Sequence, residues 1–159
     1  IIQNQAGASY IMYSWLMGFN GVMIMIGAFM NKSIIKKLSL EKAIQIGSLI
    51  ALASGLLVLI LQFTVLNPSP IAITLPCFLI FIACAFTFAN SLAICLSEVN
   101  KDIYGLAVAI FSTIQMFGAF FGGTLTSIIP NDSLLSLSFA IIISGCISLI
   151  SIRYIHKAK

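Results

Sequence analysis

Charged residues are scarce in this chain of 159 residues, in which Asp, Glu, Lys and Arg together make up only 8%. A soluble domain carries about 25% of these residues, and they keep its surface in contact with water. Hydrophobic residues account for 60% of the chain, and its mean hydropathy is +1.14. The composition therefore excludes a water-soluble globular domain and predicts an integral membrane protein.

The sequence also lacks the motifs of common catalytic and metal sites. It has one histidine, His156, and no P-loop, no G-x-S-x-G, no H-E-x-x-H and no paired carboxylates. The cysteines have no C-x-x-C spacing, so we interpret them as small buried apolar residues rather than as disulfide partners or metal ligands; they are Cys77, Cys84, Cys95 and Cys146. We expect no enzyme activity, no metal and no cofactor, and a membrane enzyme is the least supported class of function.

Long apolar segments make up most of the chain. Each is about 20 residues long, which is enough for a helix to cross ~30 Å of hydrocarbon. None alternates with period two, so a barrel is excluded. The segments cover roughly residues 10–30, 43–65, 71–96, 105–129 and 134–154. We predict an all-α membrane protein with five transmembrane helices, and we expect Pro76 in the first turn of the third helix, where proline is tolerated.

The basic residues all fall on one side of the membrane when five crossings are drawn. Connections after the first and third segments share that side with the C-terminus, and they hold all 8 basic residues: Lys32, Lys36, Lys37, Lys42, Lys101, Arg153, Lys157 and Lys159. Cytoplasmic loops carry an excess of Lys and Arg. We therefore expect a cell (inner) membrane protein with its N-terminus outside and its C-terminus in the cytoplasm. The net charge of +4 then reflects topology rather than nucleic-acid binding.

Polar amides lie within three of the predicted spans, although no ionisable Asp, Glu, Lys or Arg lies at mid-span. Asn20 is in the first segment, Asn90 is in the third with Phe86 one turn earlier, and Gln115 is in the fourth with Phe111 one turn earlier. Such amides either line a water-filled cavity or form hydrogen bonds across a helix contact, and the two readings carry similar weight. We select these five residues as candidates for a substrate cavity.

The fourth segment also contains Gly118 and Gly122, one helical turn apart. Glycines at this spacing let two helix backbones approach closely. We interpret them as a helix-packing contact, and a flexing point during conformational change is the alternative. The second and fifth segments have no amide at mid-span, which predicts two peripheral helices and three inner ones.

Three stretches resemble helices of the major facilitator superfamily, and most closely its Bcr/CflA-type drug resistance transporters. SWLMGFNGVMIMIGAFMNKSIIKK, ending at Lys37, resembles the eighth helix and the basic loop after it. AFTFANSLAICLSE, ending at Glu98, resembles the tenth helix, and GLAVAIFSTIQMFGAFFGG, ending at Gly123, resembles the eleventh. The order and sidedness of the segments follow the family over nearly the whole chain.

This resemblance implies that the chain supplies helices eight to twelve of a twelve-helix drug:proton antiporter. The first, third and fourth segments would then be inner helices, and the missing N-terminal half would be the partner. Because the chain begins at Ile1 without a visible signal peptide, we expect it to continue a longer protein. The substrates would be small amphipathic compounds exchanged for protons across the lipid bilayer.

Two other functions fit the same residues. One is a small integral membrane subunit or scaffold that binds partner helices through its glycines and amides. The other is a major facilitator transporter that carries a metabolite instead of a drug.

Overall fold

Five long α-helices and one short 3-10 turn form the computed structural model, which describes residues 9–65, 69–128 and 134–158. These ranges contain no strand. Five helices are long and apolar enough to cross a membrane, so the prediction of an all-α, multi-pass membrane protein is confirmed. The elements are α1 (Tyr10–Ile35), α2 (Leu40–Thr64), α3 (Pro70–Ser97), η1 (Lys101–Ile103), α4 (Tyr104–Ile128) and α5 (Leu134–Ala158).

Serine side chains set the beginning of the first three helices. Ser9, Ser39 and Ser69 each accept a hydrogen bond from the backbone N–H three residues later, over 3.2, 3.3 and 3.2 Å. This cap gives a partner to one of the amide groups that the first turn of a helix leaves unpaired. Polar side chains therefore define where these three apolar helices begin.

Two features of the helix ends differ from the sequence prediction. α1 continues to Ile35, past the predicted end near residue 30, so only residues 36–39 connect it to α2. Hydropathy marks where the hydrocarbon ends, whereas the backbone hydrogen bonds of α1 continue beyond it. α3 begins at Pro70, which places Pro76 inside the helix, and the expectation of a first-turn position for Pro76 was wrong.

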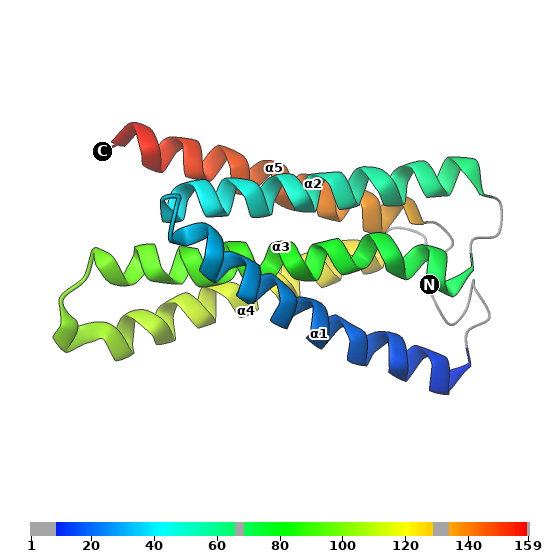
Figure 1. Ribbon diagram of the computed structural model, residues 1–159, viewed down its shortest axis with the longest axis horizontal. Helices are drawn as coiled ribbons and strands as arrows, with labels where there is room; N and C mark the ends of the chain where they lie inside the picture. The colour runs from blue at the N-terminus through cyan, green and yellow to red at the C-terminus, as the bar shows by residue number, and fades with distance from the viewer. Residues whose placement is uncertain (1–8, 66–68, 129–133, 159) are drawn as a thin grey trace.

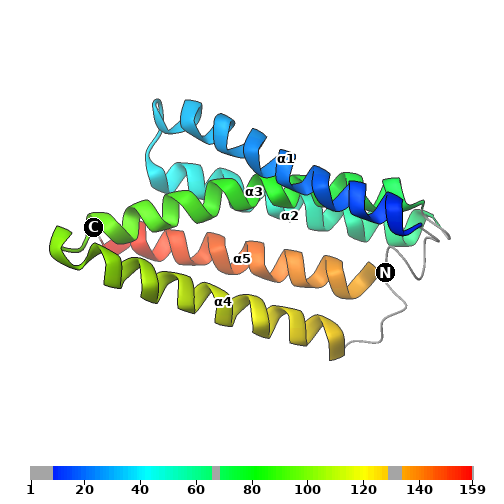
Figure 2. The ribbon, with the colours of Figure 1, turned by 90° about the horizontal axis from the view of Figure 1, so that it is seen from below.

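Four of the helices form a row, and the fifth lies along its side. α3 packs against both α1 and α2, and α2 packs against both α3 and α5 (Figures 1 and 2). α4 lies beside α3 and α5 and contacts each of them only lightly. None of the described side chains of α4 is buried. The packed core of the chain therefore excludes α4.

The contact among α2, α3 and α5 contains a tightly packed hydrophobic cluster. Val58, Ile73 and Leu134 meet there, and none of them is more than 2% exposed. The backbone N–H of Leu134 also donates a hydrogen bond to Oε1 of Gln62 over 2.8 Å. Because this amide belongs to the first residue of α5, Gln62 provides the partner that the helix itself cannot supply.

Glycines allow the helices of the row to approach closely. A Cβ atom at Gly27 of α1 would lie 2.8 Å from the Cβ of Ala85, and one at Gly47 of α2 would lie 2.7 Å from the Cβ of Phe86. These distances are shorter than a van der Waals contact, so a side chain would push the helices apart. Small residues at such contacts are typical of helix pairs in membranes.

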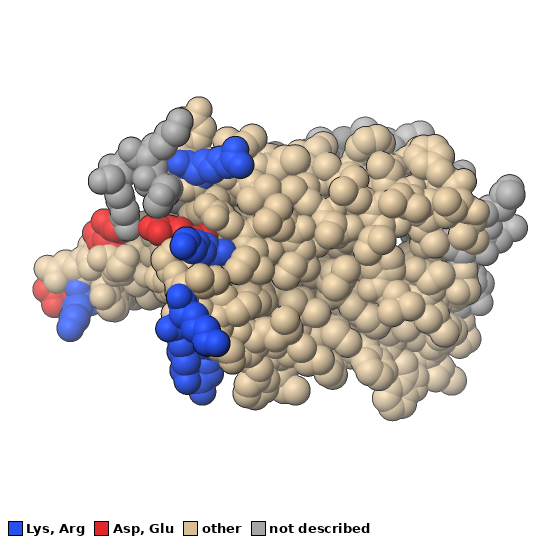
Figure 3. All heavy atoms as spheres, turned by 45° about the horizontal axis from the view of Figure 1, so that its top comes forward, with Lys and Arg blue, Asp and Glu red and all other residues tan. Residues whose placement is uncertain are grey.

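The described charged side chains gather at one end of the bundle (Figure 3). This end contains the connection from α1 to α2, the connection from α3 to α4, and the last turns of α5 (Figure 1). The opposite end and the flanks of the helices lack Lys, Arg, Asp and Glu within the described ranges. The geometry thus places the basic connections together, as five alternating crossings require.

Candidate functional site

Asn90 forms a buried amide pair that joins α1 to α3. Its Nδ2 donates to Oδ1 of Asn31 over 2.8 Å and to the carbonyl oxygen of Phe86 over 2.6 Å. Asn31 returns a bond from its Nδ2 to Oδ1 of Asn90 over 3.3 Å. Asn31 and Asn90 are 6% and 2% exposed, so water competes little for these bonds.

Asn31 is the member of this pair that the sequence reasoning missed. Hydropathy places it in the basic connection after the first segment, because Lys32 follows it directly. The available signal was its position 11 residues after Asn20, which is three helical turns along one face of a longer helix.

The α1–α3 contact has a constant register. The rings of Phe19 and Phe78 lie 6.3 Å apart between centroids. Farther along, Gly27 faces Ala85, and Asn31 faces Asn90. Residue numbers rise together on both helices, so α1 and α3 run parallel and share one face over most of their length.

Asn20 lies on this face of α1 with an incomplete set of hydrogen bonds. It is 7% exposed, and among the described residues its Nδ2 bonds only to the sulfur of Met17, over 3.5 Å. Its Oδ1 has no partner in the described part of the chain. An unpaired buried oxygen costs about 1–3 kcal/mol, so Asn20 is a poor choice for packing alone. Such a group is a candidate for a role that folding does not require.

Phe86 is fully buried, and it lies against Gly47 where α2 and α3 meet. Its carbonyl oxygen also accepts the bond from Asn90. Within this chain it is therefore a packing residue of the α2–α3 contact. A cavity-lining role for Phe86 and Asn90 stays a prediction about a larger assembly.

Phe111 and Gln115 lie on α4, away from the buried amide pair. Phe111 contacts Phe88 of α3, with ring centroids 5.7 Å apart. Gln115 is one turn farther along α4, and its side chain is exposed. Gly118 and Gly122 follow on the same side, and a Cβ atom at either position would meet nothing within 4 Å. No helix packs against these glycines within the described chain, so their predicted packing role concerns a contact outside it.

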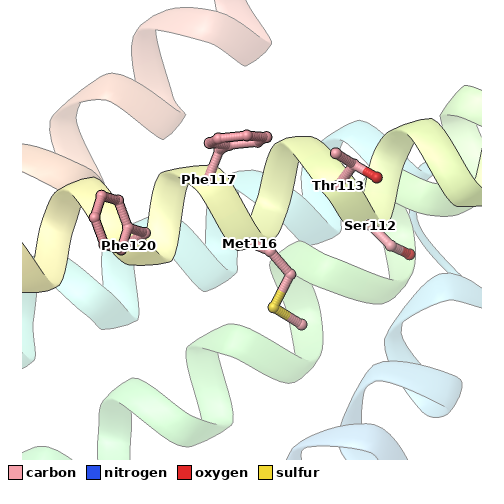
Figure 4. A pocket seen from close by; sticks show the side chains of 5 residues that line it. All are labelled: Ser112, Thr113, Met116, Phe117 and Phe120. Carbon is pink, nitrogen blue, oxygen red and sulfur yellow. The ribbon is translucent and has the colours of Figure 1, made fainter.

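A groove of about 520 Å³ separates α4 from α5. Gly118, Phe121 and Gly122 form part of the α4 wall, and Phe139 and Ser144 form part of the α5 wall. A second hollow of about 500 Å³ lies on the other side of α4, where Ser112, Thr113, Met116, Phe117 and Phe120 border it (Figure 4). Every described residue that lines this second hollow belongs to α4, so it is an open surface and not a cavity.

Besides the Gln62 amide, two serine hydroxyls connect α2 to its neighbours. The Oγ atoms of Ser48 in α2 and Ser148 in α5 lie 2.6 Å apart. Ser54 of α2 donates to the carbonyl oxygen of Pro76 in α3, also over 2.6 Å. These bonds tie helices together without leaving a polar group exposed, which agrees with a structural role for α2 and α5.

The cysteines correct one sequence interpretation. Cys84 and Cys146 are exposed, Cys77 and Cys95 are half-buried, and all four thiols are free. The interpretation of these residues as buried was wrong, because a thiol is apolar enough to face lipid as well as to pack in a protein core. The described residues contain no group of three or more His, Cys, Asp or Glu side chains that could hold a metal ion.

The arrangement brings the three amide-bearing helices side by side, with α3 between α1 and α4. Their amides and aromatic rings offer hydrogen bonds and stacking contacts, which are suited to uncharged or amphipathic molecules. Comparison of the chain with protein-family models, with curated proteins and with solved structures gave no match.

Proposed function

We propose that the chain is part of a membrane transport protein, a proton-coupled exporter of drugs or other small amphipathic compounds. Its five spans would form the greater part of the C-terminal half of a major facilitator transporter, as the resemblance of three of its helices implies. The remaining helices of that transporter would be its partner. The basic end would face the cytoplasm of a cell (inner) membrane.

The observation that supports this proposal most directly is the grouping of the amides. Asn20, Asn90 and Gln115 belong to α1, α3 and α4, and these helices are neighbours. α2 and α5 have no amide at mid-span, and serine hydroxyls of α2 bond to α3 and α5 there. A transporter with a central cavity needs polar side chains on neighbouring helices of each half, and the position of α3 between α1 and α4 supports the proposal in this respect.

The exposure of α4 favours a larger assembly. Gln115 is exposed on a helix that is apolar enough to span a bilayer. An amide in hydrocarbon loses hydrogen bonds that water would supply, at a cost of several kcal/mol in a purely apolar medium, roughly 4–8. Further helices, or a water-filled cavity between two halves, would remove this cost. In the packed chain α4 is the least buried span, which is expected of a helix that faces such a cavity.

Cysteine accessibility in the intact protein tests the assignment. Each native cysteine is first replaced by serine, and single cysteines are then introduced as Gln115→Cys, Phe111→Cys and Leu57→Cys. Leu57 is the matched control, because it is 46% exposed on α2, outside the amide-bearing helices. We expect a water-soluble thiol reagent to modify the first two variants much faster than Leu57→Cys, and a transported drug to slow that reaction. Equal, slow reaction at all three positions would contradict a cavity.

A scaffold function is the second candidate, and the bare surface of α4 favours it. Gly118 and Gly122 present a close-approach surface that no other described residue occupies. If the function is helix binding alone, Gly118→Leu would abolish capture of a partner protein, whereas deletion of the gene would leave drug sensitivity unchanged. A changed sensitivity to several drugs favours export, and a changed level of one metabolite favours the metabolite transporter.

A further inference from the structure

Positive charge is unevenly distributed over the charged end of the bundle. The last turn of α1, the connection to α2 and the first turn of α2 carry four basic residues and one acid, Glu41, for a net charge of +3. The basic residues are Lys32, Lys36, Lys37 and Lys42. The connection from α3 to α4 carries one basic residue and two acids, for a net charge of −1. We refer to the first group of four lysines, together with Leu38, as the lysine turn.

The backbone holds the tip of the lysine turn in a compact shape. The N–H groups of Lys37 and Leu38 both donate to the carbonyl oxygen of Ile34, each over 2.9 Å. Ser39 then caps α2 by accepting a bond from the N–H of Lys42 over 3.3 Å. Since the chain reverses direction within residues 36–39, the lysines on either side of the reversal are kept near one another.

The side chains of the turn combine charge with apolar surface. Lys32, Lys36, Lys37 and Lys42 are all exposed, and Leu38 is 38% exposed between them. Lysine places its aliphatic stem along apolar surface and its ammonium group in water. A leucine flanked by such lysines is suited to the boundary between lipid headgroups and acyl chains.

We propose that the lysine turn binds the phosphate headgroups of anionic phospholipids and inserts Leu38 at the level of the acyl chains. The turn connects two membrane spans, so it lies where headgroups are present at high concentration. Its net positive charge complements the headgroup phosphate, and each lysine near an anionic surface strengthens binding by about fivefold. The connection from α3 to α4 has the opposite net charge and does not take part. This inference does not depend on transport.

Lipid binding to the purified protein tests the proposal. Phosphatidylglycerol and phosphatidylcholine with the same acyl chains are compared by native mass spectrometry and by the shift of the melting temperature. We expect tighter binding of phosphatidylglycerol, with a loss on the order of 25-fold in the double variant Lys36→Gln/Lys37→Gln. The variant Lys36→Arg/Lys37→Arg should keep the preference, because it keeps the charge.

Lys101→Gln is the matched control, because it removes one exposed lysine at the same end of the bundle. It should leave phosphatidylglycerol affinity within about twofold of the unmodified protein, well below the fivefold effect expected per lysine of the turn. Equal affinity for the two lipids, or an equal loss in Lys101→Gln and Lys36→Gln, would overturn the proposal. Inorganic phosphate should compete poorly with phosphatidylglycerol for the lysine turn. If it competed as effectively as the lipid does, the acyl chains and Leu38 would contribute nothing to binding, and that part of the proposal would be wrong.

Discussion

Replacing the two asparagines of the α1–α3 pair separately and together should reveal a coupled interaction. In Asn90→Leu, the amide of Asn31 stays buried without its partner, and the bond from Asn90 to the carbonyl oxygen of Phe86 is also lost. In Asn31→Leu, the Nδ2 of Asn90 still reaches that carbonyl oxygen, but its Oδ1 loses a donor. Each single change leaves a buried polar group unpaired, at a cost of about 1–3 kcal/mol.

The double variant removes both polar groups at once. Leucine has the same branched arrangement of side-chain heavy atoms as asparagine and leaves no unpaired amide, so the loss should be smaller than the sum of the single losses. Interhelical hydrogen bonds in membrane proteins contribute roughly 0.6 kcal/mol each and at most about 1.7. For this reciprocal pair we expect a coupling energy of about 1 kcal/mol, with Asn90→Leu the more damaging single change.

The measurement is the free energy of unfolding of the protein in mixed detergent micelles, for the four members of the cycle. Asn100→Leu combined with Asn31→Leu is the control cycle, because Asn100 is exposed and makes no side-chain capping bond. Distant pairs usually add within about 0.5 kcal/mol, and the control should do so. If the Asn31/Asn90 cycle is additive to the same degree, the pair does not stabilise the α1–α3 contact and the reasoning is wrong.

Four further substitutions test individual contacts. Gly27→Ala should lower the free energy of unfolding by about 1–3 kcal/mol, because the new methyl group would overlap Ala85. Gly118→Ala is the control and should change it by no more than about 0.5 kcal/mol in the same assay. A larger loss at Gly118 would mean that another helix packs against α4 there. Asn20→Leu should raise the free energy of unfolding by about 1 kcal/mol because it removes an unpaired oxygen, and a loss would show that this oxygen has a donor. Gln62→Met should speed hydrogen exchange at the amide of Leu134 and cost about 1 kcal/mol, and unchanged exchange there would contradict the cap.

The sequence predicted the fold class because composition and segment length are global properties. Five apolar runs and few charges leave a multi-span helical protein as the solution that satisfies the backbone in lipid. Helix ends were predicted less well, because hydropathy responds to the hydrocarbon boundary and α1 continues beyond it to Ile35. The serine caps depend on single residues such as Ser39, and a hydropathy average over a whole segment does not reveal them.

The details of the site depended on which helices are neighbours, and the sequence does not state this. Asn90 was recognised as an unusual residue, but its partner Asn31 lies 59 residues earlier in the chain. Close-approach glycines could be listed from the sequence without knowing which ones are used. Gly27 and Gly47 meet another helix, whereas Gly118 and Gly122 face open space, although the latter pair has the more familiar spacing.

The pairing of α2 with α5 has a consequence for how the protein is made. Ser48 and Ser148 are 100 residues apart, so the ribosome must synthesise three further spans before α2 can meet α5. Until then the surface of α2 around Gly55, against which Ile142 of α5 later packs, is accessible to lipid and to quality-control proteases. Nascent chains that stop after α4 should therefore be degraded faster than chains that include α5, because α5 covers this surface of α2.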